Sequence, residues 1–203
     1  MTQNNILPTI LAGGKSRRFG RDKCLQKLGG KTLLNHVAEK LLTKFEKVLV
    51  VNNKNNIKKK NKIIVIKDCI KGNHGPLIGI LSAIKWAEKN SYKWVMTFPC
   101  DTPFFRSQII DKLAKKTRLK NLKIYYIQSG EERHNIFSIW PTNVGKILER
   151  KIKFDNIRKV EKLLDLLGSK KINVRNINNS FLNINTKKDY KVAKHKLKND
   201  KLH

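Results

Sequence analysis

Acidic residues are scarce in this chain of 203 residues, where 15 Asp and Glu stand against 45 Lys and Arg and give a formal net charge of +30. Such an excess is typical of proteins that bind polyanions, so a basic nucleic-acid-binding protein is one interpretation. The lysines are nevertheless spread from Lys15 to Lys201 among many Asn and Ile residues, a bias that AT-rich coding produces by itself. Charge alone therefore does not decide the function.

Cysteine and long apolar runs are also in short supply. Cys24, Cys69 and Cys100 form neither a CxxC pair nor an even disulfide set, which predicts reduced thiols that bind no metal. The N-terminal apolar run, Ile6 to Ala12, is interrupted by Pro8 and is too short for a signal peptide core or a membrane span. We therefore expect a cytoplasmic protein without a membrane segment.

The chain does contain apolar runs that alternate between two periodicities. Continuous runs predict buried strands, and apolar residues at helical spacing lie between them. This alternation predicts an α/β fold with a mostly parallel sheet covered on both faces, and the length fits a single domain. The predicted strands of the first half are Ile6–Leu11, Val48–Val51, Ile63–Ile66 and Trp94–Phe98, and the helical patterns lie at 33–42 and 77–87.

The pattern is weaker beyond Asp101. Asn183 and Asn185 occupy alternate positions, so a strand there would point both amides to one face. A basic helix is expected at the end of the chain. The other predicted elements are helices near 107–116, 144–151 and 157–167 and strands at 124–127, 136–140 and 172–174.

Polar or glycine-rich residues follow four of the predicted strands, where open parallel sheets collect their ligands. These residues are Leu11-Ala12-Gly13-Gly14, Asn52-Asn53, Asp68 and Asp101. The glycine turn exposes backbone N–H groups to phosphate oxygens, and Arg17, Arg18 and Lys23 add positive charge. A Walker A loop is excluded because its first glycine would fall on Thr9, and the GxGxxG spacing is absent.

Residues 11–23 match a longer pattern, L-A-G-G-x-S-x-R-[MF]-G-x-D-K. Three further segments follow it in order: Gly75-Pro76-Leu77-Ile78-Gly79, Pro99-Cys100-Asp101-Thr102-Pro103-Phe104 and Asn183-Ile184-Asn185-Thr186. Together they resemble molybdenum cofactor guanylyltransferases, the MobA-like family of nucleotidyltransferases. The double glycine and the PCDTP segment resemble the guanylyl branch, whereas the related cytidylyltransferases usually carry LAAG. The resemblance spans nearly the whole chain.

The resemblance implies transfer of GMP from GTP to the terminal phosphate of molybdopterin, which yields molybdopterin guanine dinucleotide and pyrophosphate. It implies a single domain over 1–203 with a three-layer, Rossmann-like fold similar to nucleotide-diphospho-sugar transferases. Residues 1–105 would form the nucleotide-binding half and residues 106–190 the acceptor-binding half. A phosphate monoester is largely ionised at neutral pH, so the attack needs no general base. Downstream molybdoenzymes or a molybdenum-insertion protein are partners by analogy.

The resemblance also implies roles for individual residues. Arg18 and Lys23 would neutralise the triphosphate and the leaving pyrophosphate, and Asp101 would hold Mg²⁺, a cation that prefers oxygen ligands. Asp68 would accept N–H donors of guanine or bind a ribose hydroxyl. The nucleotide contacts would be Leu11, Ala12, Gly13, Gly14, Lys23, Asn53, Asp68 and Asp101.

The resemblance assigns fewer residues to the binding of the acceptor. Asn183 and Asn185 would approach the metal and the acceptor, and His134 would contact the acceptor, although Asn135 replaces the family's proline. The family's Asn-x-Asn appears as Val51-Asn52-Asn53, which leaves Asn52 and Asn53 as alternatives. Other functions stay open: cytidylyl transfer to molybdopterin or another NTP-transferase reaction, nucleic-acid binding, and an inactive cofactor carrier.

Overall fold

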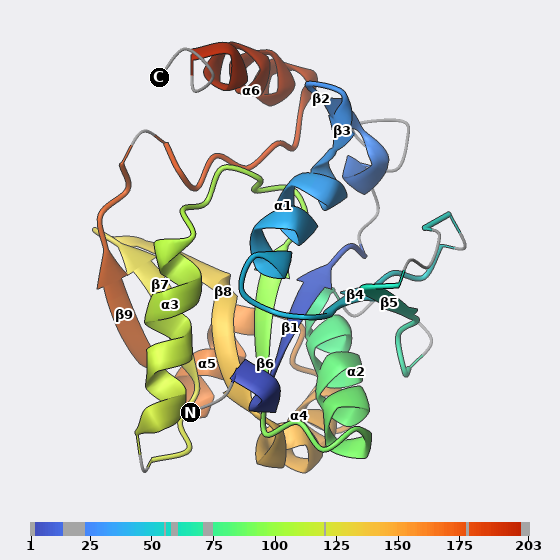
Figure 1. Ribbon diagram of the computed structural model, residues 1–203. Helices are drawn as coiled ribbons and strands as arrows, with labels where there is room; N and C mark the ends of the chain where they lie inside the picture. Colours follow the sequence, from blue (N-terminus) through green and yellow to red (C-terminus); the bar gives the residue numbers. More distant parts are fainter. Residues whose placement is uncertain are drawn as a thin grey trace.

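The computed structural model describes residues 3–13, 23–54, 56–57, 61–70, 75–119, 121–177 and 179–199 (Figure 1). Its largest element is a seven-stranded sheet with the order β5-β4-β1-β6-β8-β7-β9. The strands are β1 (Ile6–Leu11), β4 (Val48–Val51), β5 (Ile63–Ile66), β6 (Trp94–Pro99), β7 (Tyr125–Ser129), β8 (Glu132–Pro141) and β9 (Lys170–Val174). A separate hairpin joins β2 (Lys27–Leu28) to β3 (Lys31–Thr32).

Helices cover the sheet and the ends of its strands. The α-helices are α1 (Leu33–Leu42), α2 (Pro76–Lys89), α3 (Gln108–Lys115), α4 (Gly145–Lys153), α5 (Val160–Leu166) and α6 (Lys187–Asn199). Short 3-10 helices are η1 (Gln3–Asn5), η2 (Lys23–Leu25), η3 (Lys116–Arg118) and η4 (Thr142–Val144). None of the helices in this part of the chain has the length and apolar character needed to cross a membrane.

The strand order confirms the predicted α/β fold. Strands β5, β4, β1 and β6 are parallel neighbours, as the alternation of the first half predicts. Strand β8 runs antiparallel to both β6 and β7, and β9 is parallel to β7. Strands β7 and β8 are joined by a tight turn at Gly130, where φ is +59°, so they pair as a hairpin and only this half of the sheet departs from parallel order.

Alternating residues of each strand supply two apolar layers. Ile6, Ile10 and Met96 face α1 and α3 on one side, whereas Leu7 and Val95 face α2, α4 and α5 on the other. Successive side chains of a strand point to opposite faces, so a continuous apolar run is what a sheet covered on both faces requires. The result is a three-layer α/β/α architecture (Figure 1).

Local signals explain where the helices begin. The side chain of Thr32 accepts a hydrogen bond from the N–H of Asn35 at 3.1 Å, so the predicted N-cap of α1 is confirmed. Helix α2 begins at Pro76, which has no N–H to leave unsatisfied, after Gly75 with φ of +65°.

The C-terminal part of the chain crosses over the carboxyl ends of the strands. Residues 182–185 are not in a strand, so the alternation of a strand does not place the amides of Asn183 and Asn185. Helix α6 follows and packs on the β2–β3 hairpin through a small apolar cluster that includes Leu28, Leu33, Ile184 and Ala193. This packing brings a segment from the end of the chain to the region that follows β1.

Candidate active site

The carboxyl ends of four strands lie at one level. Leu11 pairs with Val51 on one side and with Pro99 on the other, and Val51 pairs with Ile66. Each of these pairs is at or next to the last residue of its strand. The polar residues that follow the four strands therefore gather along a single edge of the sheet, as predicted.

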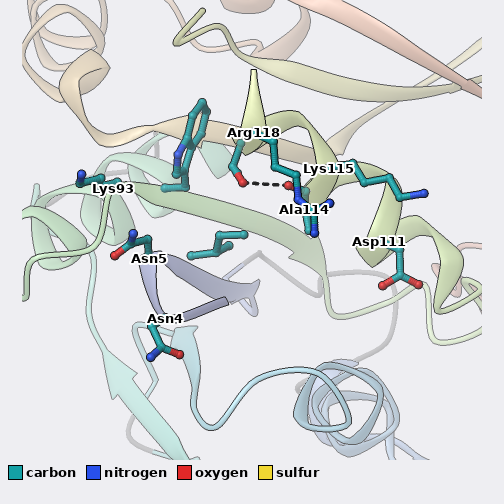
Figure 2. A pocket seen from close by; sticks show the side chains of 10 residues that line it. Asn4, Asn5, Lys93, Asp111, Ala114, Lys115 and Arg118 are labelled. Atoms are coloured by element: carbon teal, nitrogen blue, oxygen red, sulfur yellow. Dashed lines mark hydrogen bonds between the residues drawn. The ribbon is translucent and has the colours of Figure 1, made fainter. Parts of the chain in front are cut away.

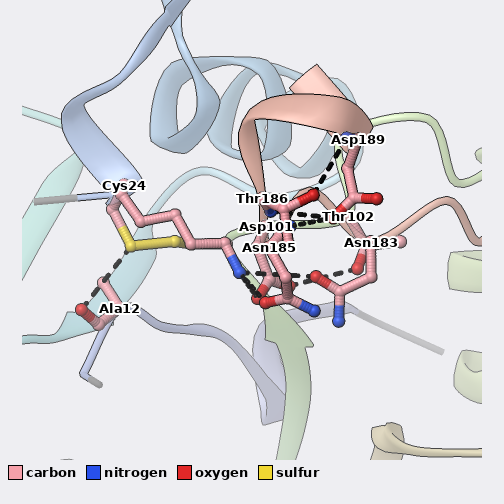
Figure 3. A network of polar contacts seen from close by, with 10 residues as sticks. Ala12, Cys24, Asp101, Thr102, Asn183, Asn185, Thr186 and Asp189 are labelled. Carbon is pink, nitrogen blue, oxygen red and sulfur yellow. Dashed lines mark hydrogen bonds and ion pairs between the residues drawn. A yellow bond between two sulfur atoms is a disulfide. The ribbon is translucent and has the colours of Figure 1, made fainter. Parts of the chain in front are cut away.

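Lys23 is the centre of a polar cluster at this edge (Figure 3). Its ammonium donates to Oδ2 of Asp101 at 2.6 Å, to Oδ1 of Asn183 at 3.4 Å, and to Oδ1 of Asn185 in a short contact. Thr102 donates its hydroxyl to the other carboxylate oxygen of Asp101 at 3.2 Å. Four of the predicted site residues, from three distant segments, are thus brought together.

Backbone and side-chain bonds hold the two asparagines in place. The N–H of Ile184, between them, donates to the carbonyl oxygen of Asp101 at 2.9 Å. The carboxylate of Asp189 accepts the N–H groups of Asn185 and Thr186 at 2.9 and 2.8 Å, and the Thr186 hydroxyl accepts the N–H of Asp189 at 3.2 Å. This reciprocal cap begins α6, and it fixes the backbone on which Asn185 is carried.

The Asp189 carboxyl is held in its ionised form, which accepts these hydrogen bonds. Partial burial would raise its pKa, but the N–H groups of Asn185 and Thr186 stabilise the ionised form and hold the pKa below its usual range. Sequence analysis did not identify Asp189. The signal was available, because Thr186-x-x-Asp189 has the spacing of a capping box.

The oxygen atoms around Lys23 are a suitable set for a hard cation. One carboxylate and two amide oxygens converge on a single positive charge, and oxygen ligands of these types are those that Mg²⁺ accepts together with water and phosphate. Across the residues that the structure describes, no group of three or more His, Cys, Asp or Glu side chains is arranged to hold a metal. A divalent ion at Asp101 would accordingly need amide, water or substrate oxygens.

Asn53 and Asp68 form a second pair at the ends of β4 and β5. The N–H of Asp68 donates to Oδ1 of Asn53 at 2.8 Å, and the Asn53 amide donates to the Asp68 carboxylate. Asn52 is instead buried, and its Oδ1 accepts the N–H of Lys54 at 2.6 Å. Of the two asparagines that the sequence left open, Asn53 is the one that accompanies Asp68.

Helix α2 comes close to Asp68 at Gly79. A Cβ placed on Gly79 would lie 3.2 Å from Cδ2 of Leu11 and 3.9 Å from Oδ1 of Asp68. Leu11, Gly79 and Asp68 therefore border one small region. Such close packing explains why the first turn of α2 carries glycine here.

The glycine turn after β1 is only partly described. The N–H of Ala12 donates to the carbonyl oxygen of Val51 at 3.0 Å, which extends the sheet by one residue. A Cβ on Gly13 would meet no described atom within 4 Å. Gly14 and Arg18, which were predicted to bind the nucleotide phosphates, lie outside the described residues.

His134 makes its contacts on the β7–β8 hairpin. Nε2 lies 3.0 Å from the hydroxyl oxygen of Ser129, and the imidazole stacks on Phe181 with ring centroids 3.8 Å apart. Burial lowers the pKa of His134 below 6.5, and the nearby Glu132 carboxylate opposes this shift. Phe181 lies two residues before Asn183, so this stacking places His134 beside the start of the segment that carries the two asparagines.

The prediction of three reduced cysteines is wrong for two of them. Cys24 and Cys100 form a disulfide, with their Cα atoms 5.9 Å apart, and Cys69 is a free, exposed thiol. Widely spaced cysteines carry no pairing signal by themselves, because the fold decides which ones meet. The clue was that Cys24 follows Lys23 and Cys100 precedes Asp101, two residues predicted to share a site.

A separate hollow lies at the opposite end of the sheet (Figure 2). It has a volume of about 830 Å³ and is lined by Asn4, Asn5, Lys93, Asp111, Lys115 and Arg118, among others. Asn5 and Lys93 directly precede β1 and β6, so this hollow is at the amino ends of the strands. Of the predicted site residues that the structure describes, none lines it.

Comparison with known proteins agrees with this geometry. Residues 9–170 match the family described as "MobA-like NTP transferase domain". A protein from Haemophilus influenzae named "Molybdenum cofactor guanylyltransferase" is 30% identical over 92% of this chain and 96% of its own length. One of the same name from Yersinia pseudotuberculosis is 32% identical over 92% of this chain and 94% of its own. The crystal structure of "Molybdopterin-guanine dinucleotide biosynthesis protein A" from Archaeoglobus fulgidus superposes with a TM-score of 0.79 at 24% identity, covering 95% of this chain and 98% of that one.

Proposed function

Because the chain belongs to the family of MobA-like NTP transferase domains, we propose that it transfers GMP from GTP to the terminal phosphate of molybdopterin. The products are molybdopterin guanine dinucleotide and pyrophosphate. The choice of guanine and of this acceptor is supported by relatives that are named molybdenum cofactor guanylyltransferases and cover nearly the whole chain. A supply of GTP implies that the reaction takes place in the cytoplasm.

The observation that carries the proposal is the convergence of oxygen atoms on Lys23. Asp101, Asn183 and Asn185 surround its ammonium at the edge of the sheet where nucleotides bind in this class of fold. We assign Asp101 as the ligand of Mg²⁺, with Asn183 and Asn185 beside the metal and the acceptor. When bound, the cation neutralises charge on the phosphate oxygens.

Lys23 has a second role in the proposed reaction. In the free protein its ammonium is paired with Asp101, and a triphosphate offers it stronger partners. Lys23 then neutralises charge that moves onto the departing pyrophosphate, and Arg18 assists it. The acceptor phosphate is already ionised near neutral pH, so it attacks the α-phosphorus of GTP without a general base, and catalysis depends on alignment and charge neutralisation.

The nucleoside is assigned to the other part of the edge. The backbone of Leu11, Ala12, Gly13 and Gly14 approaches the nucleotide, because glycine lets phosphate oxygens reach the backbone N–H groups without a Cβ in the way. Asp68, held by Asn53, accepts hydrogen bonds either from the guanine edge or from the ribose. His134 contacts the acceptor or supports the segment that does, and the product passes to a molybdoenzyme or a molybdenum-insertion protein.

The decisive experiment measures pyrophosphate release by the purified protein with molybdopterin and Mg²⁺, and with GTP or CTP as the donor. We expect turnover with GTP well above that with CTP, and a rise in melting temperature with GTP and Mg²⁺, because a ligand that binds only the native state stabilises it. Equal or faster turnover with CTP would favour cytidylyl transfer. Absence of turnover combined with salt-sensitive RNA or DNA binding at physiological ionic strength would favour a nucleic-acid-binding protein.

A further inference from the structure

The disulfide between Cys24 and Cys100 joins two backbone segments that carry chemistry (Figure 3). The cysteines are 76 positions apart in sequence, and each is at most 5% exposed. Cys24 follows Lys23 in η2, and Cys100 lies between the end of β6 and Asp101. The covalent bond therefore connects the immediate neighbours of the two charged residues in the cluster.

The surroundings of the disulfide also belong to the site. The N–H of Cys100 donates to the carbonyl oxygen of Leu11 at 3.4 Å, and Sγ of Cys24 lies 3.6 Å from the carbonyl oxygen of Ala12. Cys100 is thus anchored to the sheet. Cys24 is in a 3-10 helix of only three residues, so the disulfide holds a short segment against a rigid one.

The ion pair beside the disulfide competes with a metal for the same carboxylate. The side chains of Lys23 and Asp101 are only 12% and 22% exposed, so their attraction is less screened than that of a surface pair. A divalent cation at Asp101 requires the ammonium to withdraw from it. Two thiols pack farther apart than two bonded sulfur atoms do, so the reduced protein gives η2 room to carry Lys23 away.

We propose that Cys24 and Cys100 form a reversible redox modification site, in which the disulfide locks Lys23 onto Asp101 and weakens binding of the divalent cation. This inference rests on the proposed function, which assigns the cation to Asp101. The reduced protein is the active form. Disulfides in proteins of reducing compartments are usually transient and redox-sensing, which fits a bond placed at a reactive site.

The oxidant is a small disulfide such as oxidised glutathione, and the step is a pair of exchanges. One cysteine thiolate attacks a glutathione sulfur, forms a mixed disulfide and expels one glutathione thiolate. The second cysteine thiolate then attacks the protein sulfur of the mixed disulfide and expels the other. Two electrons pass from the cysteines to the glutathione disulfide, and the two cysteine protons end on two glutathione thiols.

The test compares the full-length protein after treatment with oxidised glutathione and after treatment with dithiothreitol. Alkylation in denaturant followed by mass spectrometry should find Cys24 and Cys100 joined in the oxidised form, where Cys69 is either alkylated or carries glutathione, and all three cysteines alkylated in the reduced form. Turnover of GTP with molybdopterin is then measured against Mg²⁺ concentration. We expect the oxidised form to need at least about tenfold more Mg²⁺ for half-maximal rate, because the disulfide opposes the withdrawal of Lys23 that breaks its charge-assisted hydrogen bond to Asp101, whereas the reduced form permits it.

Two variants distinguish the effect of the Cys24–Cys100 disulfide from the effect of oxidation elsewhere in the protein. Cys24→Ser should behave like the reduced protein under both treatments, and Cys69→Ser should keep the full redox response. Binding of Mn²⁺, followed by electron paramagnetic resonance, gives a readout that does not depend on turnover. If the oxidised form binds Mn²⁺ more weakly than the reduced form, the modification site is supported, even if the protein does not turn over GTP. Absence of GTP turnover would refute only the proposed function.

Three outcomes would overturn the inference. The first is alkylation of all three cysteines after oxidation. The second is identical dependence on Mg²⁺ and Mn²⁺ in the two forms. The third is a redox response that persists in Cys24→Ser.

Discussion

The ammonium nitrogen of Lys23 lies 2.6 Å from Oδ2 of Asp101, although the two residues are 78 positions apart in the chain. Asn183 and Asn185, from the C-terminal part of the sequence, also accept hydrogen bonds from the Lys23 ammonium through their amide oxygens. The protein thus presents its own positive charge at the position where we propose that a metal binds. Exchange of one cation for another is a natural first step on binding GTP with Mg²⁺.

Replacing Asp101 by Asn should lower the rate of pyrophosphate release from GTP by about 100-fold or more, in the range found when one group that stabilises the transition state is removed. The fold should persist, because Asn has the same shape as Asp and its one amide oxygen can still accept a hydrogen bond from either the Thr102 hydroxyl or the lysine ammonium. Asp155→Asn is the matched control, since Asp155 pairs with Lys151 at the end of α4. Unchanged turnover in Asp101→Asn would refute the metal assignment.

Substitution of Asp68 by Asn should separate the two roles that remain for this carboxylate. If Asp68 reads the guanine edge, the wild type prefers GTP to ITP, which lacks the 2-amino group, and the variant loses that preference together with about 10- to 100-fold in kcat/KM for GTP. If Asp68 binds the ribose, the variant loses discrimination against 2′-deoxy-GTP and treats GTP and ITP as the wild type does. An unaltered kcat/KM for all three nucleotides would remove Asp68 from the binding site.

Asp189→Ala should affect catalysis through Asn185, because the carboxylate holds the backbone N–H groups of Asn185 and Thr186. Loss of such a cap costs about 0.5–2 kcal/mol of stability. We further expect a higher Mg²⁺ requirement, which a loss of stability alone would not produce. Lys191→Ala, an exposed change on the same helix, should leave the Mg²⁺ requirement as it is.

The burial of His134 predicts a pH dependence of stability. Its pKa is lowered in the folded protein, so the unfolded chain binds the proton more tightly between the folded pKa and the ordinary value of 6.5. The stabilisation is complete above pH 6.5 and is lost as the pH falls from there through the folded pKa. Melting temperatures measured from about pH 8 to about pH 5 should therefore fall less steeply in His134→Phe than in the wild type.

The variant Glu132→Gln tests whether His134 is responsible for the fall in melting temperature at acidic pH. The carboxylate of Glu132 raises the pKa of His134, so its removal should lower the folded pKa further. The acid-induced loss of melting temperature should then be larger than in the wild type. A smaller loss would show that another group governs the titration.

The regular elements were predictable because each carries its own local signal. The four parallel strands are short continuous apolar runs, and α1 and α2 combine helical spacing with a cap at Thr32 and a proline at position 76. The β2–β3 hairpin was missed, because two residues per strand are too few to show a period. The antiparallel direction of β8 was missed as well, since an apolar run does not reveal its direction.

The candidate site was predictable where it follows strand ends and not where it depends on tertiary contact. Asp68 and Asp101 directly follow apolar runs, and the order of strands places them on one edge. Asn183 and Asn185 were identified from the family motif, but their position comes from tertiary bonds of Ile184 and Asp189 that the motif does not reveal. The pairing of Cys24 with Cys100 has no signal in the cysteine spacing, and only their positions next to Lys23 and Asp101 hint at it.

The bond from the N–H of Ile184 to the carbonyl oxygen of Asp101 has a consequence for biosynthesis on the ribosome. The seven strands are complete at Val174, so a nascent chain that has emerged to this point already contains the whole sheet. Domains fold from the N-terminal side during translation, and the sheet can form before the two amides arrive. On the proposed roles of Asn183 and Asn185, the newly made protein would then pass through a folded stage that binds GTP but turns it over only once residues 183–185 have joined the site.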